Sequence, residues 1–230
     1  MVIGNGMIAK RFSPYADNKK WLVFASGVSH SMAISDAEFE REKNLLQQTI
    51  QNNQHKTLAY FSTCSIYDPS LQHSPYVMHK LQMEELIKNN AAAYLIFRVS
   101  NPVGLTNNHH TVLNYFVEHI TSQTFFTLWQ YASRNLIDID DMFLLCNHII
   151  QSGLWLNKII NIANPVNYPV TAIIQYIENY LGQKGNFELA EQGNSPLIDT
   201  SDIQPLFIQL HIEFGNNYLP ILLQKYFPQK

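Results

Sequence analysis

Three nearly uninterrupted apolar runs in the first half of this chain constrain its fold more than any other feature. They are Trp21–Ala25 (WLVFA), Thr57–Phe61 (TLAYF) and Ala92–Val99 (AAYLIFRV). Strands that are apolar on both faces are typical of a parallel sheet whose two faces are covered. Between the runs, residues 36–52 and 78–89 carry apolar residues at helical spacing among charged ones. This alternation predicts an α/β fold with a helix-covered parallel sheet.

The second half of the chain is less regular, but it contains further segments of both kinds. A stub of strand at residues 1–3 opens the chain. The segments predicted as helices in the second half are residues 111–122, 142–151, 170–181, 199–206 and 216–226. Short strands or extended pieces are predicted at residues 135–139, 159–163 and 209–214. We expect this half to supply a last strand and a small lobe over the carboxyl edge of the sheet.

Composition limits the class of protein. The length of 230 residues suits one domain, or one domain with an additional lobe, and the 46% of hydrophobic residues suffices for a dry core. Its net charge of −3 excludes a generally basic nucleic-acid binder. No apolar run approaches the roughly 20 residues of a membrane span, and no signal peptide opens the sequence. We therefore expect a globular cytoplasmic protein with neither nucleic acid nor membrane as a partner.

The cysteines and histidines indicate neither a disulfide framework nor a metal site. Cys64 and Cys146 are too few for a disulfide scaffold or a four-ligand zinc set. Only His109 and His110 are adjacent histidines, and neighbouring side chains do not converge on one ion in regular structure. We expect a solvated loop there and no bound metal. Cys64 is expected to be a small buried residue rather than a reactive thiol.

A glycine-rich turn follows the first strand stub. Its pattern, Gly4-x-Gly6-x-x-Ala9, lies between a strand and a helix, as a dinucleotide-binding turn requires. The first glycine permits the turn, the second lets backbone approach a pyrophosphate, and the helix start supplies N–H donors. A tight turn in any α/β protein would have the same pattern. After the next strand no ribose-binding carboxylate appears before Asp36, and Arg11 could meet a 2′-phosphate but is more typical of a surface residue.

A candidate reacting group follows the second apolar run. Tyr76 and Lys80 are spaced to share one helix face, so the ammonium can stand near the phenol. A nearby positive charge favours the phenolate and lowers the pKa of a tyrosine towards the working pH. The phenol can then exchange a proton with a sugar hydroxyl while hydride leaves the same carbon, and Thr63 would complete the hydrogen bonds to that oxygen. Alone, Tyr-x-x-x-Lys is also a common helix-surface pair.

Taken in order, these motifs resemble the extended short-chain dehydrogenase/reductase family, specifically the NAD-dependent sugar-nucleotide epimerases and dehydratases. The matching segments are the glycine turn at 4–9, Ala25-Ser26-Gly27, FSTCSIYD at 61–68, SPYVMHKLQMEELI at 74–87, FRVSNPVGL at 97–105, RNLIDIDDM at 134–142, and the segments at 161–182 and 199–214. The resemblance implies a shortened Rossmann-like parallel sheet with a small, mostly helical C-terminal substrate lobe. Residues 1–107 would be the cofactor-binding part and residues 108–230 the mixed part that supplies the last sheet strand and the lobe.

The resemblance also implies a role for each matching residue. Thr63 would orient the reacting oxygen, Tyr76 would be the acid/base, and Lys80 would be its cationic partner and a ribose contact. The implied cofactor contacts are Gly4, Asn5, Gly6, Met7, Ile8, Ala25, Ser26, Gly27, Tyr76 and Lys80. The implied substrate contacts are Thr63, Asn101 and Arg134, with Arg134 facing a diphosphate, while Asp141 would order the lobe.

The implied activity is that of an epimerase or ketoreductase that uses NAD or NADP on a nucleotide-linked sugar, in surface polysaccharide synthesis. Members often pair through a helical bundle, so the helix at 78–89 is a candidate homodimer interface. The chain departs from the family between Phe12 and Trp21, where the second and third strand units with the ribose-binding acid are missing. This departure leaves the choice between NAD and NADP open, and it keeps a second hypothesis, a non-catalytic nucleotide-sensing or scaffold member.

A second departure concerns dehydration. Dehydratases of the family place Asp-Glu directly after the catalytic threonine, where this chain has Cys64 and Ser65. We therefore do not expect a 4,6-dehydratase.

Several other residues admit two interpretations. His30 and Ser31 could line the pocket or lie in a surface loop. Glu84 and Glu85 resemble a carboxylate pair, but adjacent helix positions diverge by about 100°, so a glycosidase pair is not supported. Three aromatic residues before Arg134 could stack on a base, although packing under the lobe is expected; they are Phe126, Trp129 and Tyr131.

Overall fold

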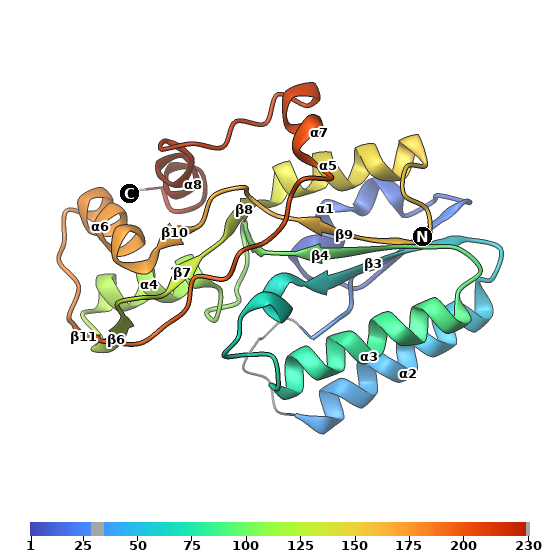
Figure 1. The fold of residues 1–230 in the computed structure, drawn as a ribbon, viewed down its shortest axis with the longest axis horizontal. Coiled ribbons are helices and arrows are strands. Elements are labelled where there is room, and N and C mark those ends of the chain that lie inside the picture. Colours follow the sequence, from blue (N-terminus) through green and yellow to red (C-terminus); the bar gives the residue numbers. More distant parts are fainter. Residues whose placement is uncertain (29–34, 229–230) are drawn as a thin grey trace.

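A computed structural model describes residues 1–28 and 35–228 of the chain. Its centre is a five-stranded parallel sheet with the strand order β1-β2-β3-β4-β9 (Figure 1). The strands are β1 (Val2–Ile3), β2 (Trp21–Phe24), β3 (Thr57–Thr63), β4 (Tyr94–Val99) and β9 (Lys158–Ile162). The expected α/β class with a shortened parallel sheet is confirmed, and β9 comes from the second half of the chain.

Helices cover both faces of this sheet (Figure 1). One face is covered by α2 (Asp36–Asn52) and α3 (Pro75–Asn90), and the other by α1 (Met7–Arg11), α5 (Ile139–Ser152) and α7 (Gln204–Gln209). Leu22 and Phe24 pack on the side of α2 and α3, whereas Val23 between them packs on the other side. Successive side chains of a strand point to opposite faces, so a strand between two helical layers is apolar throughout.

The two helices nearest the candidate site begin at favourable capping residues. The Ser35 side chain accepts a hydrogen bond from the backbone N–H of Glu38 and starts α2. The Ser74 side chain does the same for α3, and Pro75 takes the first helical position, where its missing N–H costs nothing. As a result α3 begins earlier than the predicted 78–89 and includes Tyr76 in its first turn.

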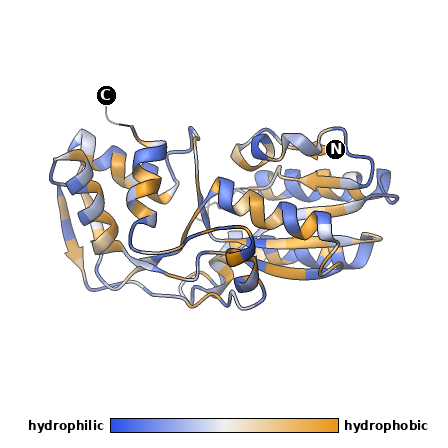
Figure 2. Ribbon diagram, turned by 90° about the horizontal axis from the view of Figure 1, so that it is seen from above, coloured by the Kyte–Doolittle hydropathy of each residue, from blue (hydrophilic) through white to orange (hydrophobic). Residues whose placement is uncertain are grey.

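The rest of the second half forms a lobe beside the sheet, and Figure 2 shows the two parts next to each other. The lobe contains α4 (Val112–Ser122), α6 (Val170–Leu181) and α8 (Tyr218–Tyr226). Three two-stranded sheets accompany these helices. They pair β5 (Asn101–Val103) with β8 (Leu136–Asp138), β6 (Phe126–Trp129) with β11 (Phe187–Ala190), and β7 (Ser133–Arg134) with β10 (Tyr168–Pro169). A separate apolar cluster that includes Leu113, Ile173 and Leu222 holds the lobe together. None of the helices in the described ranges has the length and apolarity needed to cross a membrane.

Two predictions for the C-terminal segment are wrong. The helix expected at residues 199–206 is α7, which begins only at Gln204. Pro205 then lies in the first turn, whereas an earlier start would place its ring in the helix interior against a preceding carbonyl. The segment 209–214, expected to be extended, contains a turn in which the Ile212 N–H donates to the Phe207 carbonyl and His211 has a φ of 54°.

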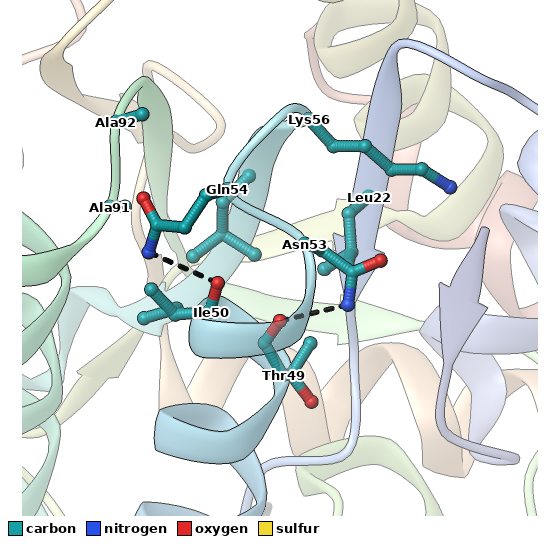
Figure 3. A pocket seen from close by; sticks show the side chains of 9 residues that line it. Leu22, Thr49, Ile50, Asn53, Gln54, Lys56, Ala91 and Ala92 are labelled. Atoms are coloured by element: carbon teal, nitrogen blue, oxygen red, sulfur yellow. Dashed lines mark hydrogen bonds between the residues drawn. The ribbon is translucent and has the colours of Figure 1, made fainter.

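A small hollow lies at the amino ends of β2 and β3 (Figure 3). Leu22 and Leu58, near the starts of these strands, line it together with the end of α2. The side-chain amides of Asn53 and Gln54 donate to carbonyls of the last helical turn at 2.9 and 3.1 Å. The hollow measures about 10 Å³, which is room for about one water molecule. The hollow therefore lies at the amino ends of the strands, whereas the candidate site lies at their carboxyl ends.

Candidate active site

The carboxyl ends of β1 and β2 bring the glycine turn against the small residues that follow β2. Gly4 has a φ of 124°, a conformation that L side chains rarely adopt. A Cβ at Gly4 would collide with the backbone of Ala25 and Ser26. Gly6 precedes α1, and a Cβ there would meet nothing within 4 Å. The predicted phosphate turn is therefore tightly packed at Gly4 and open at Gly6.

We expect Gly4→Ala to lower the free energy of unfolding by about 3 kcal/mol, because the positive φ and the overlap with Ala25 both oppose a side chain. Gly6→Ala, in the same turn, is expected to cost less than about 1 kcal/mol, because a φ of −73° suits any residue. Urea denaturation of both variants measures the difference. Equal losses of stability would contradict this account of the turn.

Thr63 ends β3 at the same edge of the sheet and starts the short helix η2 (Cys64–Tyr67). Its Oγ1 accepts a hydrogen bond from the backbone N–H of Ser65 and donates one to the Ser65 hydroxyl, both at 3.0 Å. The side chain is buried. The local turn therefore fixes the hydroxyl of Thr63 at the strand end, the position that the sequence predicts for it.

Tyr76 lies in the first turn of α3 and packs in a small apolar cluster with Val28 and Val77. The residue is 7% exposed. No hydrogen bond joins its hydroxyl to another residue within 1–28 and 35–228. The ring is thus held by apolar contacts, while the hydroxyl is uncommitted within the described part of the chain.

Lys80 lies one turn further along α3 and is almost completely buried. Its Nζ donates to Glu42 Oε1 at 2.9 Å and to the hydroxyl of Tyr60 at 3.2 Å. A Cβ at Gly27 would lie 2.5 Å from this Nζ, so the ammonium sits directly beneath Gly27. Two residues predicted as cofactor contacts, Gly27 and Lys80, are therefore adjacent, although the ion pair with Glu42 was not foreseen.

Three buried polar residues around this ammonium are not predicted from the sequence: Glu42 on α2, Tyr60 on β3 and His79 on α3. Two signals could have pointed to them. Glu42 lies on the apolar stripe of its helix near Leu46, and a buried acid needs a partner. Tyr60 interrupts a run buried on both faces, and a buried phenol needs a hydrogen-bond partner. Neither signal identifies which residues would pair.

The predicted substrate residues lie where the lobe meets the sheet edge. Asn101 begins β5, and its Nδ2 donates to the Asn135 carbonyl at 2.8 Å. Arg134 ends β7 and donates to the Ser133 carbonyl at 2.8 Å. Burial lowers the pKa of Arg134, and the carboxylate of Asp68, which follows η2, acts in the opposite direction. The Arg134 guanidinium of the lobe therefore lies within electrostatic reach of the segment that follows Thr63.

Two other residues tie α5 to its neighbours. Arg11 donates from Nε to Asp140 at 2.5 Å, and its guanidinium lies 3.8 Å from the ring centroid of Phe143. The Arg11 guanidinium therefore has partners within the protein, and its position does not require a cofactor 2′-phosphate as a further partner. Asp141 accepts a hydrogen bond from the hydroxyl of Tyr218 in α8 at 2.7 Å. Burial raises the pKa of Asp141, against the effect of this hydrogen bond, and the contact links the lobe to α5.

The adjacent acids on α3 diverge, as helix geometry predicts. Glu84 is buried and pairs with Arg98 at 2.6 Å. Glu85 is exposed and pairs with Lys88 at 2.6 Å.

Cys64 is buried as expected, and burial raises the pKa of its thiol. None of these groups forms a second reacting site.

The aromatic residues before Arg134 separate in the structure. Phe126 is buried in the lobe, but Trp129 and Tyr131 are 43% and 56% exposed, so packing under the lobe is wrong for these two. Trp129 is exposed because side chains alternate between the two faces of β6, so every second one points outward. His109 and His110 are exposed, as expected for a solvated loop. His30 and Ser31 lie outside the described residues.

The strand ends fit part of a nicotinamide dinucleotide. Gly4 brings its turn against β2, and a Cβ at Gly27 would collide with Lys80 Nζ and the Glu42 carboxylate, so glycine lets the backbone after β2 lie directly on these side chains. Ser100, directly after β4, has a buried hydroxyl without a hydrogen-bond partner in the described ranges, so a polar ligand could satisfy it. The fit is weaker at the adenosine end, because β1 is the edge strand of the described sheet and no neighbouring strand offers a ribose-binding acid there.

Comparisons with known proteins show the family and the fold that this chain resembles. The model of the NAD dependent epimerase/dehydratase family matches residues 24–163, which is well over half of the chain. The matched range contains Thr63, Tyr76, Lys80, Asn101 and Arg134, but it begins after the glycine turn. No curated protein matches the chain.

Solved structures with a similar fold include three enzymes. A UDP-N-acetylglucosamine 4-epimerase from Methanobrevibacter ruminantium, in complex with UDP-N-acetylmuramic acid, has a TM-score of 0.70 at 15% identity and covers 90% of this chain and 75% of its own. A UDP-glucuronic acid 4-epimerase from Bacillus cereus, in complex with NAD and a UDP-4-deoxy-4-fluoro-glucuronic acid, has a TM-score of 0.69 at 16% identity. The match covers 81% of this chain and 68% of the epimerase. A dTDP-glucose 4,6-dehydratase from Bacillus anthracis, in complex with NAD, has a TM-score of 0.69 at 14% identity. The match covers 90% of this chain and 71% of the dehydratase. At these identities the similarity concerns the fold.

Proposed function

Since the chain belongs to the NAD dependent epimerase/dehydratase family, we propose that it catalyses epimerisation or keto reduction of a nucleotide-linked sugar with NAD or NADP. One observation carries the proposal. Thr63, Tyr76 and Lys80 all lie within the matched residues, and Thr63 and Lys80 are buried at or beneath the carboxyl edge of the sheet. Similar solved structures that bind UDP sugars support the choice of substrate class.

In this proposal Tyr76 and Thr63 contact one oxygen of the sugar, and Lys80 acts beside Tyr76. Tyr76 exchanges a proton with the sugar hydroxyl, as a general acid or base. Thr63 holds the same oxygen through its Oγ1, and Lys80 supplies a cation on the helix face of Tyr76. When bound, the nicotinamide supplies the redox chemistry that no side chain can provide.

Arg134 is proposed to hold the diphosphate of the substrate. Its guanidinium is largely shielded from water, which lowers its pKa, and within the described residues it forms no ion pair with a carboxylate. A half-buried cation without a close counter-ion favours an anionic ligand, and arginine binds phosphate oxygens through two parallel hydrogen bonds. Asn101, at the start of β5, would contact the same ligand from the sheet edge.

We propose that the reaction does not include 4,6-dehydration, although one similar fold belongs to a 4,6-dehydratase. Cys64 and Ser65 follow Thr63 in this chain. Burial raises the pKa of the Cys64 thiol, so it is a poor acid, and Ser65 carries a hydroxyl where the dehydratase pattern has a carboxyl group. Neither residue supplies the acid and base that elimination of water needs.

The alternative proposal is a non-catalytic member that senses a nucleotide or serves as a scaffold. The edge position of β1 favours it, because the described sheet offers no strand for the adenosine half of a dinucleotide. The preserved Thr63, Tyr76 and Lys80 favour the enzyme. We further propose a cytoplasmic location, a role in surface polysaccharide synthesis and a homodimer through α3.

Calorimetric titration of the purified protein with NAD and with NADP tests the proposed function first. We expect micromolar binding of at least one of them, and then turnover in a screen of UDP- and dTDP-linked sugars. Lys80→Met is expected to weaken that binding at least about tenfold, because an ammonium–ribose contact is lost. Binding of neither dinucleotide to a well-folded sample would favour the non-catalytic alternative.

A further inference from the structure

A closed polar cluster lies beneath Gly27, between α2, α3 and β3. Its centre is the carboxylate of Glu42, which is fully buried. Glu42 Oε1 accepts from the hydroxyl of Tyr60 at 2.7 Å and from Lys80 Nζ at 2.9 Å. Glu42 Oε2 lies 2.7 Å from the backbone N–H of Val28, which donates to it, and 3.0 Å from His79 Nε2. Four partners thus surround one carboxylate in the interior.

These contacts keep Glu42 ionised. Burial by itself would raise the pKa of the carboxyl group, but the charge of Lys80 and the hydrogen bonds from His79, Tyr60 and Val28 outweigh it. The pKa of Glu42 therefore lies well below its usual range. The cluster contains a carboxylate and an ammonium in direct contact, so its charges largely cancel.

The same contacts limit what Lys80 can offer to the site. An ammonium has three N–H donors. In the described residues, Glu42 and Tyr60 occupy two of them, which leaves one for a hydroxyl in the site. The Tyr60 hydroxyl also lies within electrostatic range of Tyr76, since a charge on Tyr76 raises the pKa of Tyr60. Tyr76 therefore lies within electrostatic range of Tyr60, which contacts both Glu42 and Lys80.

We propose that Glu42 is a positioning residue, which anchors the Lys80 ammonium beneath Gly27 with one N–H free and offsets the positive charge that Lys80 presents to Tyr76. This inference rests on the proposed function only for its consequence in catalysis. It adds to the expectation drawn from the motif alone, which identifies Lys80 as the cation near Tyr76 and identifies no counter-charge for it.

Other charged groups near this cluster are few in the described residues. Arg41 of α2 is exposed and donates to the carbonyl of Ser26 at 3.1 Å. Glu84 of α3 acts on Tyr60 through space, but it is paired with Arg98 of β4. A single substitution at Glu42 therefore removes the one negative charge that directly contacts Lys80 within residues 1–28 and 35–228.

The test is a spectroscopic pH titration of Tyr76, which needs neither substrate nor cofactor. Phenolate absorbance is recorded for the protein and for its Tyr76→Phe counterpart, and the difference reports Tyr76 alone. With Glu42→Gln, we expect the Tyr76 titration to move to lower pH by about one unit, because Lys80 loses its counter-charge. Glu42→Asp, which keeps the charge, should restore most of the wild-type titration.

Glu40→Gln is the matched control, since Glu40 is an exposed acid on the same helix that pairs with Lys43. It should leave the titration of Tyr76 unchanged. An unmoved titration in Glu42→Gln, or a move to higher pH, would overturn the proposal.

A second measurement keeps the proposal testable if Glu42→Gln does not fold. The double variant Glu42→Gln/Lys80→Met removes both buried charges and should then recover a cooperative unfolding transition, because no unpaired charge remains. A double variant no better folded than Glu42→Gln would mean that Glu42 does not compensate Lys80, and would overturn the proposal. Absence of dinucleotide binding together with a shifted Tyr76 titration would reject the proposed function and leave this inference standing.

Discussion

Replacing Tyr76 with phenylalanine is expected to lower the turnover of a nucleotide-linked sugar about a thousandfold, with the fold intact. The phenyl ring keeps the apolar contacts with Val28 and Val77, so packing in this cluster is preserved. The variant loses the only group that we propose to exchange a proton with the substrate, and such groups contribute about 10²–10⁴ in rate. The measurement is kcat with the sugar nucleotide found in the screen, next to the thermal unfolding curve of each protein.

Tyr15→Phe is the matched control for this prediction. Tyr15 is also buried and donates a hydrogen bond from its hydroxyl, to Asn147 at 2.6 Å. It lies in η1 (Ser13–Tyr15), and its backbone carbonyl contacts the N-terminal ammonium, away from the carboxyl ends of the strands. We expect near-native kcat from Tyr15→Phe. A native rate in Tyr76→Phe would reject Tyr76 as the acid/base.

Glu84→Gln is expected to lower the free energy of unfolding by about 3 kcal/mol, the second large effect. The Glu84 carboxylate accepts from Arg98 Nε at 2.9 Å, from Arg98 Nη2 at 2.6 Å and from the hydroxyl of Ser62 at 2.6 Å. Neutral glutamine leaves the mostly buried guanidinium of Arg98 without its counter-charge, and breaking a buried pair from one side costs about 3–5 kcal/mol. Chemical denaturation followed by circular dichroism measures the loss.

Glu85→Gln provides the comparison, because Glu85 is the next residue on the same helix. Its partner Lys88 and its own carboxylate are both exposed to water, so the change should stay within about 0.5 kcal/mol. The double variant Glu84→Gln/Arg98→Met removes both buried charges and should be more stable than Glu84→Gln alone. Similar losses in Glu84→Gln and Glu85→Gln would show that burial does not decide the strength of these pairs.

Local chemistry explains which elements were predicted well. The helix predicted at 36–52 is α2 at those residues, with Ser35 as its cap, and the helix predicted at 170–181 is α6, which ends at Gly182 in the left-handed conformation. Caps and apolar spacing act over a few residues and can be recognised along the chain. The strand pairs of the lobe were mostly missed, because strands of two to four residues become stable only through partners far away in the sequence.

The candidate site divides in the same way. The sequence by itself determined that Tyr76 and Lys80 share a helix face and that Thr63 ends a buried strand, because helical spacing and apolar runs are local properties. Only the tertiary structure decided that Lys80 meets Glu42, a residue 38 positions away on another helix. That contact depends on how α2 and α3 pack on the sheet, and no local pattern of residues determines which charge lies opposite a buried ammonium.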